Sequence, residues 1–95
     1  MNRDELRAKT HKSISKLFNK LDELDVKKDE LSAKAKAEYA EMRVKMEAKK
    51  VALQAKYDEI ETASENSVED LKIAFDKSKK SFKKAFENIK TNFTA

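Results

Sequence analysis

The amino-acid sequence predicts an all-α protein, an antiparallel helical hairpin or coiled coil, and three observations support this prediction. First, the 95 residues include no Gly and no Pro, which supply the tight turns that sheet proteins need, so an all-β or α/β fold is close to excluded. Second, Lys, Glu, Ala and Leu, all strong helix formers, are among the commonest residues. Third, the larger apolar residues recur every three or four positions, as they do on one face of a helix.

The first predicted helix is long, from about residue 3 to residue 62, and its start carries a capping box. Asn2 can accept a hydrogen bond from a first-turn amide, while Glu5 reaches back to the amide of Asn2. An apolar stripe continues along this segment through Leu6, Ile14, Leu17, Leu21, Leu24, Leu31, Ala35, Tyr39, Met42, Met46, Leu53, Tyr57 and Ile60. An unbroken helix of this length would measure on the order of 90 Å.

A second arrangement is compatible with the same pattern. Asp25 could cap a new helix, and a break at residues 25–28 would give a three-helix bundle, a monomer with helices of unequal length. Residues 27–30 continue a helix without difficulty, however, so the single long helix is the favoured prediction. The three-helix bundle stays as the alternative.

Small apolar residues form a further stripe within the predicted long helix, at Ala33, Ala37, Ala40, Val44, Ala48, Val51 and Ala55. Together with the main stripe, it predicts a face wide enough to contact two neighbouring helices. Small side chains let helix backbones approach closely. Residues 33–60 are therefore expected at the centre of a bundle.

The last predicted helix, residues 67–93, follows a turn at residues 63–67. The turn coincides with the densest cluster of Thr, Ser and Asn, whose side chains compete for backbone hydrogen bonds. The helix is basic, with seven Lys against two acids between residues 71 and 93. Its apolar face carries Leu71, Phe75, Phe82, Phe86, Ile89 and Phe93. The whole chain, residues 1–95, is thus expected to form one helical domain.

An uncovered leucine seam follows from the favoured arrangement. If the last helix folds back on the C-terminal half of the long one, the leucines of residues 10–35 have no neighbour. A bare apolar seam usually recruits another chain, so we expect a homo-oligomer, with a dimer favoured. The seam residues are Leu17, Leu21, Leu24 and Leu31. The leading expectation is a non-enzymatic structural or protein-interaction protein that self-associates.

The basic last helix supports a second interpretation, peripheral binding to an anionic membrane surface. A helix with Phe on one face and Lys on the other can lie in a lipid interface or in a partner's groove. The residues of this face are Phe75, Phe82, Phe86, Phe93, Lys79, Lys80 and Lys83. Packing of the Phe stripe inside the bundle is the competing interpretation. Nucleic-acid binding has less support, because Arg is scarce and acids are interleaved with the lysines.

No catalytic, cofactor-binding or metal site is expected. The chain has no Cys, and its one histidine, His11, has no carboxylate three or four positions away with which to share a proton or a metal ion. Phosphate-binding loops of the usual kinds need Gly. We therefore expect no enzyme activity, no cofactor and no small-molecule substrate.

The first residues, 1–6, lack the apolar stretch of a secretory signal. No apolar run in the sequence is long enough to span a membrane. The absence of Cys fits a reducing compartment. A cytoplasmic location is therefore expected.

A motif opens the last helix: Ser67-Val68-Glu69-Asp70-Leu71-Lys72 leads into Phe75-Asp76-Lys77-Ser78 and Phe82-Lys83-Lys84-Ala85-Phe86. This order resembles the tail of small bacterial coiled-coil proteins with apolipoprotein-like helices. The resemblance implies a long charged helix followed by an amphipathic one. It implies no catalytic activity and no site residues, because that group has no assigned activity. Phe stands here where those tails usually have Trp.

Overall fold

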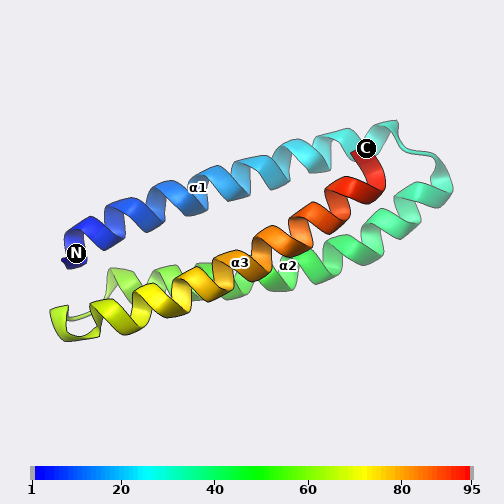
Figure 1. Cartoon of the computed structure of the whole chain (residues 1–95). Helices are drawn as coiled ribbons and strands as arrows, with labels where there is room; N and C mark the ends of the chain where they lie inside the picture. The colour runs from blue at the N-terminus through cyan, green and yellow to red at the C-terminus, as the bar shows by residue number, and fades with distance from the viewer. Residues whose placement is uncertain (1, 95) are drawn as a thin grey trace.

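The computed structural model describes residues 2–94, which form three α-helices that run up, down and up along one long axis (Figure 1). Helix α1 spans Arg3–Lys27, α2 spans Ala33–Glu61 and α3 spans Val68–Thr94. A short 3-10 turn precedes each of the last two helices, at Lys28–Glu30 and Glu65–Ser67. The bundle measures 50 × 19 × 17 Å. The two ends of the chain lie at opposite ends of this rod (Figure 1).

The favoured prediction of one helix from residue 3 to residue 62 is wrong, and the chain forms three helices, as the alternative predicts. α1 ends at Lys27, and Leu31 has extended backbone angles, φ −81° and ψ 153°. Ser32 then caps α2, because its hydroxyl accepts a hydrogen bond of 3.2 Å from the Ala35 amide. The break thus lies at residues 28–32, just beyond the region considered from the sequence. The helices are similar in length, at 25, 29 and 27 residues.

The chain breaks between α1 and α2, and does not continue as one helix, because the break allows the leucines of α1 to be buried. Leu17, Leu21 and Leu24 are all buried once α1 folds back on the other helices. Removing each of them from water stabilises the folded chain by about 1.5–3 kcal/mol. Interrupting the helix loses a few backbone hydrogen bonds, each with a net value of about 1 kcal/mol, and the Ser32 cap restores one of them.

The structure contains the Asn2 cap of α1 and a turn ahead of α3. The Asn2 side chain accepts a hydrogen bond of 2.8 Å from the Glu5 amide and so caps α1. The turn predicted at residues 63–67 lies between the end of α2 at Glu61 and the start of α3 at Val68. Within it, the Ser67 amide donates to the carbonyl oxygen of Ser64 at 3.1 Å.

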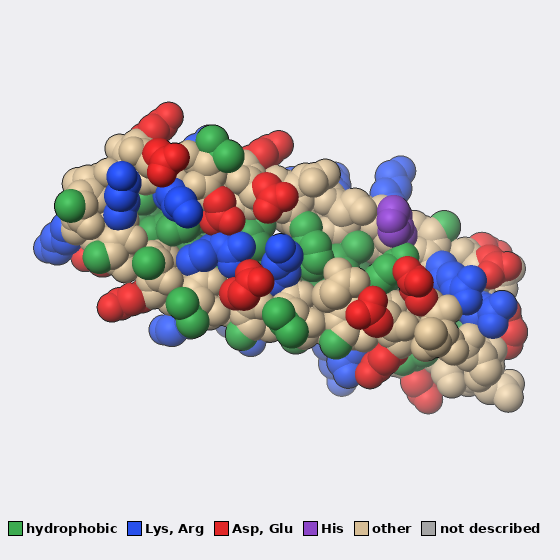
Figure 2. All heavy atoms as spheres, turned by 180° about the vertical axis from the view of Figure 1, so that it is seen from behind, with side chains coloured by type: hydrophobic (Ala, Val, Ile, Leu, Met, Phe, Trp, Pro, Cys, Tyr) green, Lys and Arg blue, Asp and Glu red, His purple; other side chains and the backbone are tan. Residues whose placement is uncertain are grey.

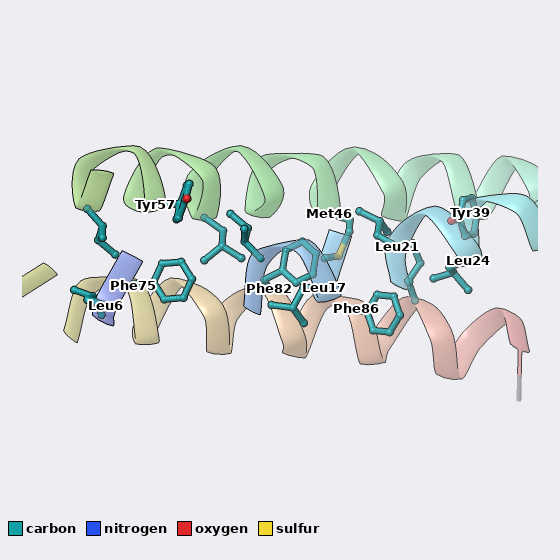
Figure 3. Packing of buried hydrophobic residues seen from close by; sticks show 14 of the residues in the cluster. Leu6, Leu17, Leu21, Leu24, Tyr39, Met46, Tyr57, Phe75, Phe82 and Phe86 are labelled. Atoms are coloured by element: carbon teal, nitrogen blue, oxygen red, sulfur yellow. The ribbon is translucent and has the colours of Figure 1, made fainter. Parts of the chain in front are cut away.

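The hydrophobic core runs the length of the rod and takes side chains from all three helices (Figure 3). Its most deeply buried members are Leu6, Leu21, Met46, Leu53, Ile60, Phe75, Phe82 and Ile89. α2 and α3 pack most extensively against each other, and α1 runs alongside and contacts both of them. Within residues 2–94, no helix combines the length and the apolar character that crossing a bilayer requires.

Candidate functional site

The predicted leucine seam lies inside the bundle. Leu17, Leu21 and Leu24 are buried, and Leu31 is partly buried against the core. The expectation that this seam is left uncovered is therefore wrong, since α1 contacts both other helices. These leucines hold the chain's own helices together and offer no free apolar surface.

The Phe stripe of α3 also points inward. Figure 3 shows Phe75, Phe82 and Phe86 directed from α3 into the space between the helices, and all three are buried. Phe93, near the C-terminal end, is partly buried against the same core. Lipid contact through these rings would require α3 to leave the bundle, so binding to an anionic membrane surface stays a prediction.

The lysines named with that stripe lie in different settings. Lys80 and Lys83 are exposed. Lys79 is half-buried, and its ammonium group donates to the Ser13 hydroxyl of α1 at 3.4 Å. Lys79 and Lys83 face α1, whereas Lys80 does not line the groove between the two helices. The sequence places these lysines together, but the fold assigns them to two faces.

A polar cluster joins α1 to the start of α2. The Tyr39 hydroxyl and the Arg43 guanidinium both donate to the carboxylate of Asp25, with the Arg43 Nε at 2.9 Å from Oδ1. Burial alone would raise the pKa of Asp25, but the hydrogen bonds from Arg43 and Tyr39 outweigh it and hold that pKa below its usual value. Burial and the same hydrogen bond raise the pKa of Tyr39. Arg43 also pairs with Glu47 at 2.8 Å.

At the other end of the rod, two arginines of α1 cap α2. Arg7 donates to the carbonyl oxygen of Glu61, and Arg3 donates to that of Ala63 at 3.2 Å. The last carbonyls of a helix lack partners and carry a partial negative charge, so cations are favoured there. Both arginines therefore have a structural role at this helix end, and the Nε of each is buried without a hydrogen-bond partner among residues 2–94.

His11 and its surroundings show no arrangement typical of catalysis. Its ring centroid lies 5.9 Å from that of Tyr57, at an interplanar angle of 50°. Burial and a hydrogen bond with Glu61 raise the pKa of Tyr57 to about 12. In the part of the chain that the structure describes, no three His, Asp or Glu side chains lie close enough together to hold a metal ion.

The small apolar stripe of α2 faces solvent, so its expected place at the centre of the bundle is wrong. Its seven members, Ala33, Ala37, Ala40, Val44, Ala48, Val51 and Ala55, are all exposed. A helix turns by about 100° per residue. Val44 is two positions from both Met42 and Met46, so it lies on the opposite side of the helix. The two stripes thus form opposite faces, and a bundle of three helices buries only one of them.

Figure 2 shows this side of the molecule, where a row of hydrophobic side chains follows the lower edge over α2. Acidic and basic side chains border the row on both sides (Figure 2). Two shallow grooves lie beside the row. One runs between Ala40 and Val44 and the turn at Lys28 and Asp29, and the other lies between Val51 and Ala55 and Phe18 of α1. In one of them, the Lys50 ammonium lies 5.1 Å from the centroid of the Phe18 ring, within the range of a cation–π contact.

Most of the charged residues that line the groove between α1 and α3 are lysines. One half, with a volume of about 420 Å³, has Leu17, Leu24 and Phe86 at its floor and both Lys and Glu at its rim. The other half lies between Leu6 and Phe75. Along the whole groove, the lining lysines are Lys9, Lys20 and Lys27 of α1 and Lys72, Lys79, Lys83 and Lys90 of α3. Sequence reasoning about the last helix alone missed the lysines that α1 contributes.

Comparison with known protein families, with curated proteins and with solved structures finds no match to this chain. Its function is therefore inferred from its own residues.

Proposed function

We propose that this chain is a non-enzymatic interaction protein that associates with a second copy of itself through the outward face of α2. The observation that carries the proposal is the exposure of that face. Val44 is 72% exposed and Val51 is 61% exposed, on a stripe whose other members are all Ala. Isolated exposed apolar residues are ordinary, whereas a continuous row along one helix is typical of a contact surface.

The spacing of the stripe suits a straight helix pair. Its seven residues follow steps of 4, 3, 4, 4, 3 and 4, which amount to two repeats of eleven residues between 33 and 55. An eleven-residue repeat keeps an apolar row nearly parallel to the helix axis and does not impose a left-handed supercoil. Because the side chains are small, two such helices can approach more closely than helices with leucine seams.

The charges that border the stripe support an antiparallel pair centred on Val44. Glu41 and Lys45 lie on the same flank of the stripe, both exposed. An antiparallel pair would bring Glu41 of each copy beside Lys45 of the other. Such rim charges favour one orientation and register and contribute little to affinity. Since Ala and Val bury little area, we expect a weak dimer whose population rises with concentration across the micromolar range.

Sedimentation velocity over a range of protein concentrations tests the proposal. Val44→Lys combined with Val51→Lys should reduce the dimer to monomer without changing the circular dichroism spectrum, because both side chains are exposed. Val26→Lys combined with Ile73→Lys is the matched control, since those residues are 73% and 51% exposed and lie outside the stripe. A wild-type chain that stays monomeric at millimolar concentration contradicts the proposal. Equal dissociation by both double variants also contradicts it.

A further inference from the structure

We infer that the lysine-lined groove between α1 and α3 binds the phosphate backbone of single-stranded nucleic acid without regard to base sequence. This inference is independent of the α2 surface, which lies on another side of the bundle. The sequence alone disfavours nucleic acid because acids alternate with lysines along the chain. Folding changes this balance, because it brings seven lysines to the groove together with only three acids, Asp76, Glu23 and Glu87. The groove thus accounts for the whole formal net charge of +4.

Two contacts indicate the relative register of the two helices. Lys79 donates to Ser13, 66 positions earlier in the chain, at 3.4 Å, and the Phe82 ring contacts that of Phe18, 64 positions earlier. Because α1 and α3 run in the same direction (Figure 1), each residue of α3 lies level with a residue of α1 about 64–66 positions earlier. Taken in order along the axis, the lysines are then Lys72, Lys9, Lys79, Lys83, Lys20, Lys90 and Lys27.

This order forms a ladder of positive charge. Successive lysines differ by about one to six residues in level, which corresponds to about 1.5–9 Å along a helix. The ladder covers about 30 Å. Phosphates in a stacked strand are about 3.4 Å apart along the axis and lie farther apart once the strand is extended. An extended strand can therefore lay several phosphates along the ladder.

The charges in the groove are largely available to a ligand. Lys9, Lys20, Lys27 and Lys83 form no ion pair with any residue between 2 and 94. Asp76 is paired with Lys72 at 4.0 Å. Glu23 and Glu87 lie at nearly the same level, so they interrupt the ladder at one place. Lys9, Lys20, Lys27 and Lys83 are exposed, so their ammonium groups are hydrated until a phosphate replaces the water and counterions.

The shape of the groove favours a strand over a duplex or a membrane. Packed helices have axes about 8–10 Å apart, so the hollow between them is narrow and admits one strand. The apolar side chains of the groove are buried at its floor, and they cannot insert into lipid. For the same reason no aromatic ring is available to stack on bases, so the contacts are to phosphate, and base identity has no effect.

Fluorescence anisotropy with a labelled oligothymidylate of about twenty nucleotides tests the inference on the full chain. We expect binding at low salt, with a slope of log K against log salt between about −3 and −5, as seven lysines partly offset by three acids would give. Lys20→Gln with Lys83→Gln, one residue from each side of the groove, should weaken binding about tenfold and make the slope less negative by about 1–1.5. Circular dichroism checks that both variants keep the wild-type helix content.

The matched control is Lys77→Gln with Lys84→Gln. These exposed lysines belong to α3 but lie outside the groove, and their loss lowers the net charge by the same amount. We expect the control to weaken binding by less than about twofold. Equal losses in both double variants, or no binding of the wild type at low salt, overturn the inference. Tighter binding to a duplex of equal length, to inorganic polyphosphate or to anionic vesicles than to the single strand also overturns it.

Discussion

The Tyr39 hydroxyl donates a hydrogen bond to the carboxylate of Asp25, fourteen positions earlier in the chain. The same tyrosine ring contacts Phe93 of α3 edge-on, with centroids 5.4 Å apart at 75°. One residue near the start of α2 thus links the end of α1 to the end of α3. Because Arg43 donates to the same carboxylate, this end of the bundle is held by a polar cluster that surrounds the break between α1 and α2.

Loss of the Tyr39 hydroxyl should destabilise the bundle. Tyr39→Phe keeps the ring against Phe93 and removes one hydrogen bond to a charged acceptor, for which we expect a loss of about 1–2 kcal/mol in the free energy of unfolding. Urea denaturation followed by circular dichroism measures it. Tyr57→Phe is the control, since that hydroxyl bonds Glu61, an exposed residue, and should matter less. If both variants are as stable as the wild type, the Tyr39 hydrogen bond to Asp25 contributes nothing to the free energy of unfolding.

Stability should fall on acidification, in part through Asp25. The hydrogen bonds from Arg43 and Tyr39 hold the pKa of Asp25 below its ordinary value of 3.8 in the folded chain. The unfolded chain therefore binds this proton more readily, and the stabilisation is complete above 3.8 and is lost as pH falls through the lower folded-state pKa.

Thermal melting of the wild type and of Asp25→Asn between about pH 7 and pH 2 reports this contribution. The variant should melt at a lower temperature at neutral pH, and the difference should shrink in the acid range as the wild-type carboxylate becomes protonated. A difference in melting temperature that stays constant over the whole range contradicts the assignment.

Truncation of Phe82 should be among the most damaging single changes. Its side chain is 0% exposed, and it contacts Phe18 of α1 with ring centroids 5.7 Å apart. We expect Phe82→Ala to cost about 3–5 kcal/mol of unfolding free energy. Ile73→Ala, at an exposed site on the same helix, should cost no more than about 0.5 kcal/mol. An unchanged melting temperature for Phe82→Ala would mean that the ring is not in the core, as the lipid-binding interpretation requires.

The Ser32 cap should contribute to the break between the first two helices. Ser32→Ala removes the hydrogen bond to the Ala35 amide and should cost about 0.5–2 kcal/mol. Ser15→Ala is the control, because Ser15 is exposed in the interior of α1, where Ala is the better helix former. The control should be neutral or slightly stabilising. If Ser32→Ala is also neutral, the cap has no measurable role in ending the helix.

The all-α fold, the Asn2 cap and the turn before α3 could be predicted from the sequence because each depends on local chemistry. The break at residues 28–32 could not be fixed in this way. Its segment contains neither Gly nor Pro, and its residues tolerate a helix, so burial of Leu21 and its neighbours decides the outcome. Ser32 ahead of an Ala-rich run was the one local signal of a helix start.

The surfaces were harder to predict than the core. The spacing of Val44 and Val51 reveals a stripe. The side of α2 on which it lies, opposite Met46, follows only when the rotation of about 100° per residue is counted between the two residues. The groove could not be predicted from either segment alone, because it forms only when the fold brings Lys20 of α1 beside Lys83 of α3. Their pairing follows from the three-helix arrangement, which the favoured prediction of one long helix did not provide.

The arrangement of α1 relative to α2 is tested most directly by the distance between two spin labels. The chain has no Cys, so Ala8→Cys with Glu59→Cys places labels at two exposed positions. In a continuous helix these sites would be on the order of 75 Å apart. With labelled chains diluted in unlabelled protein, the three-helix bundle predicts a single short distance, within its 19 × 17 Å cross-section plus the two label tethers. A dominant distance near the continuous-helix value would contradict it.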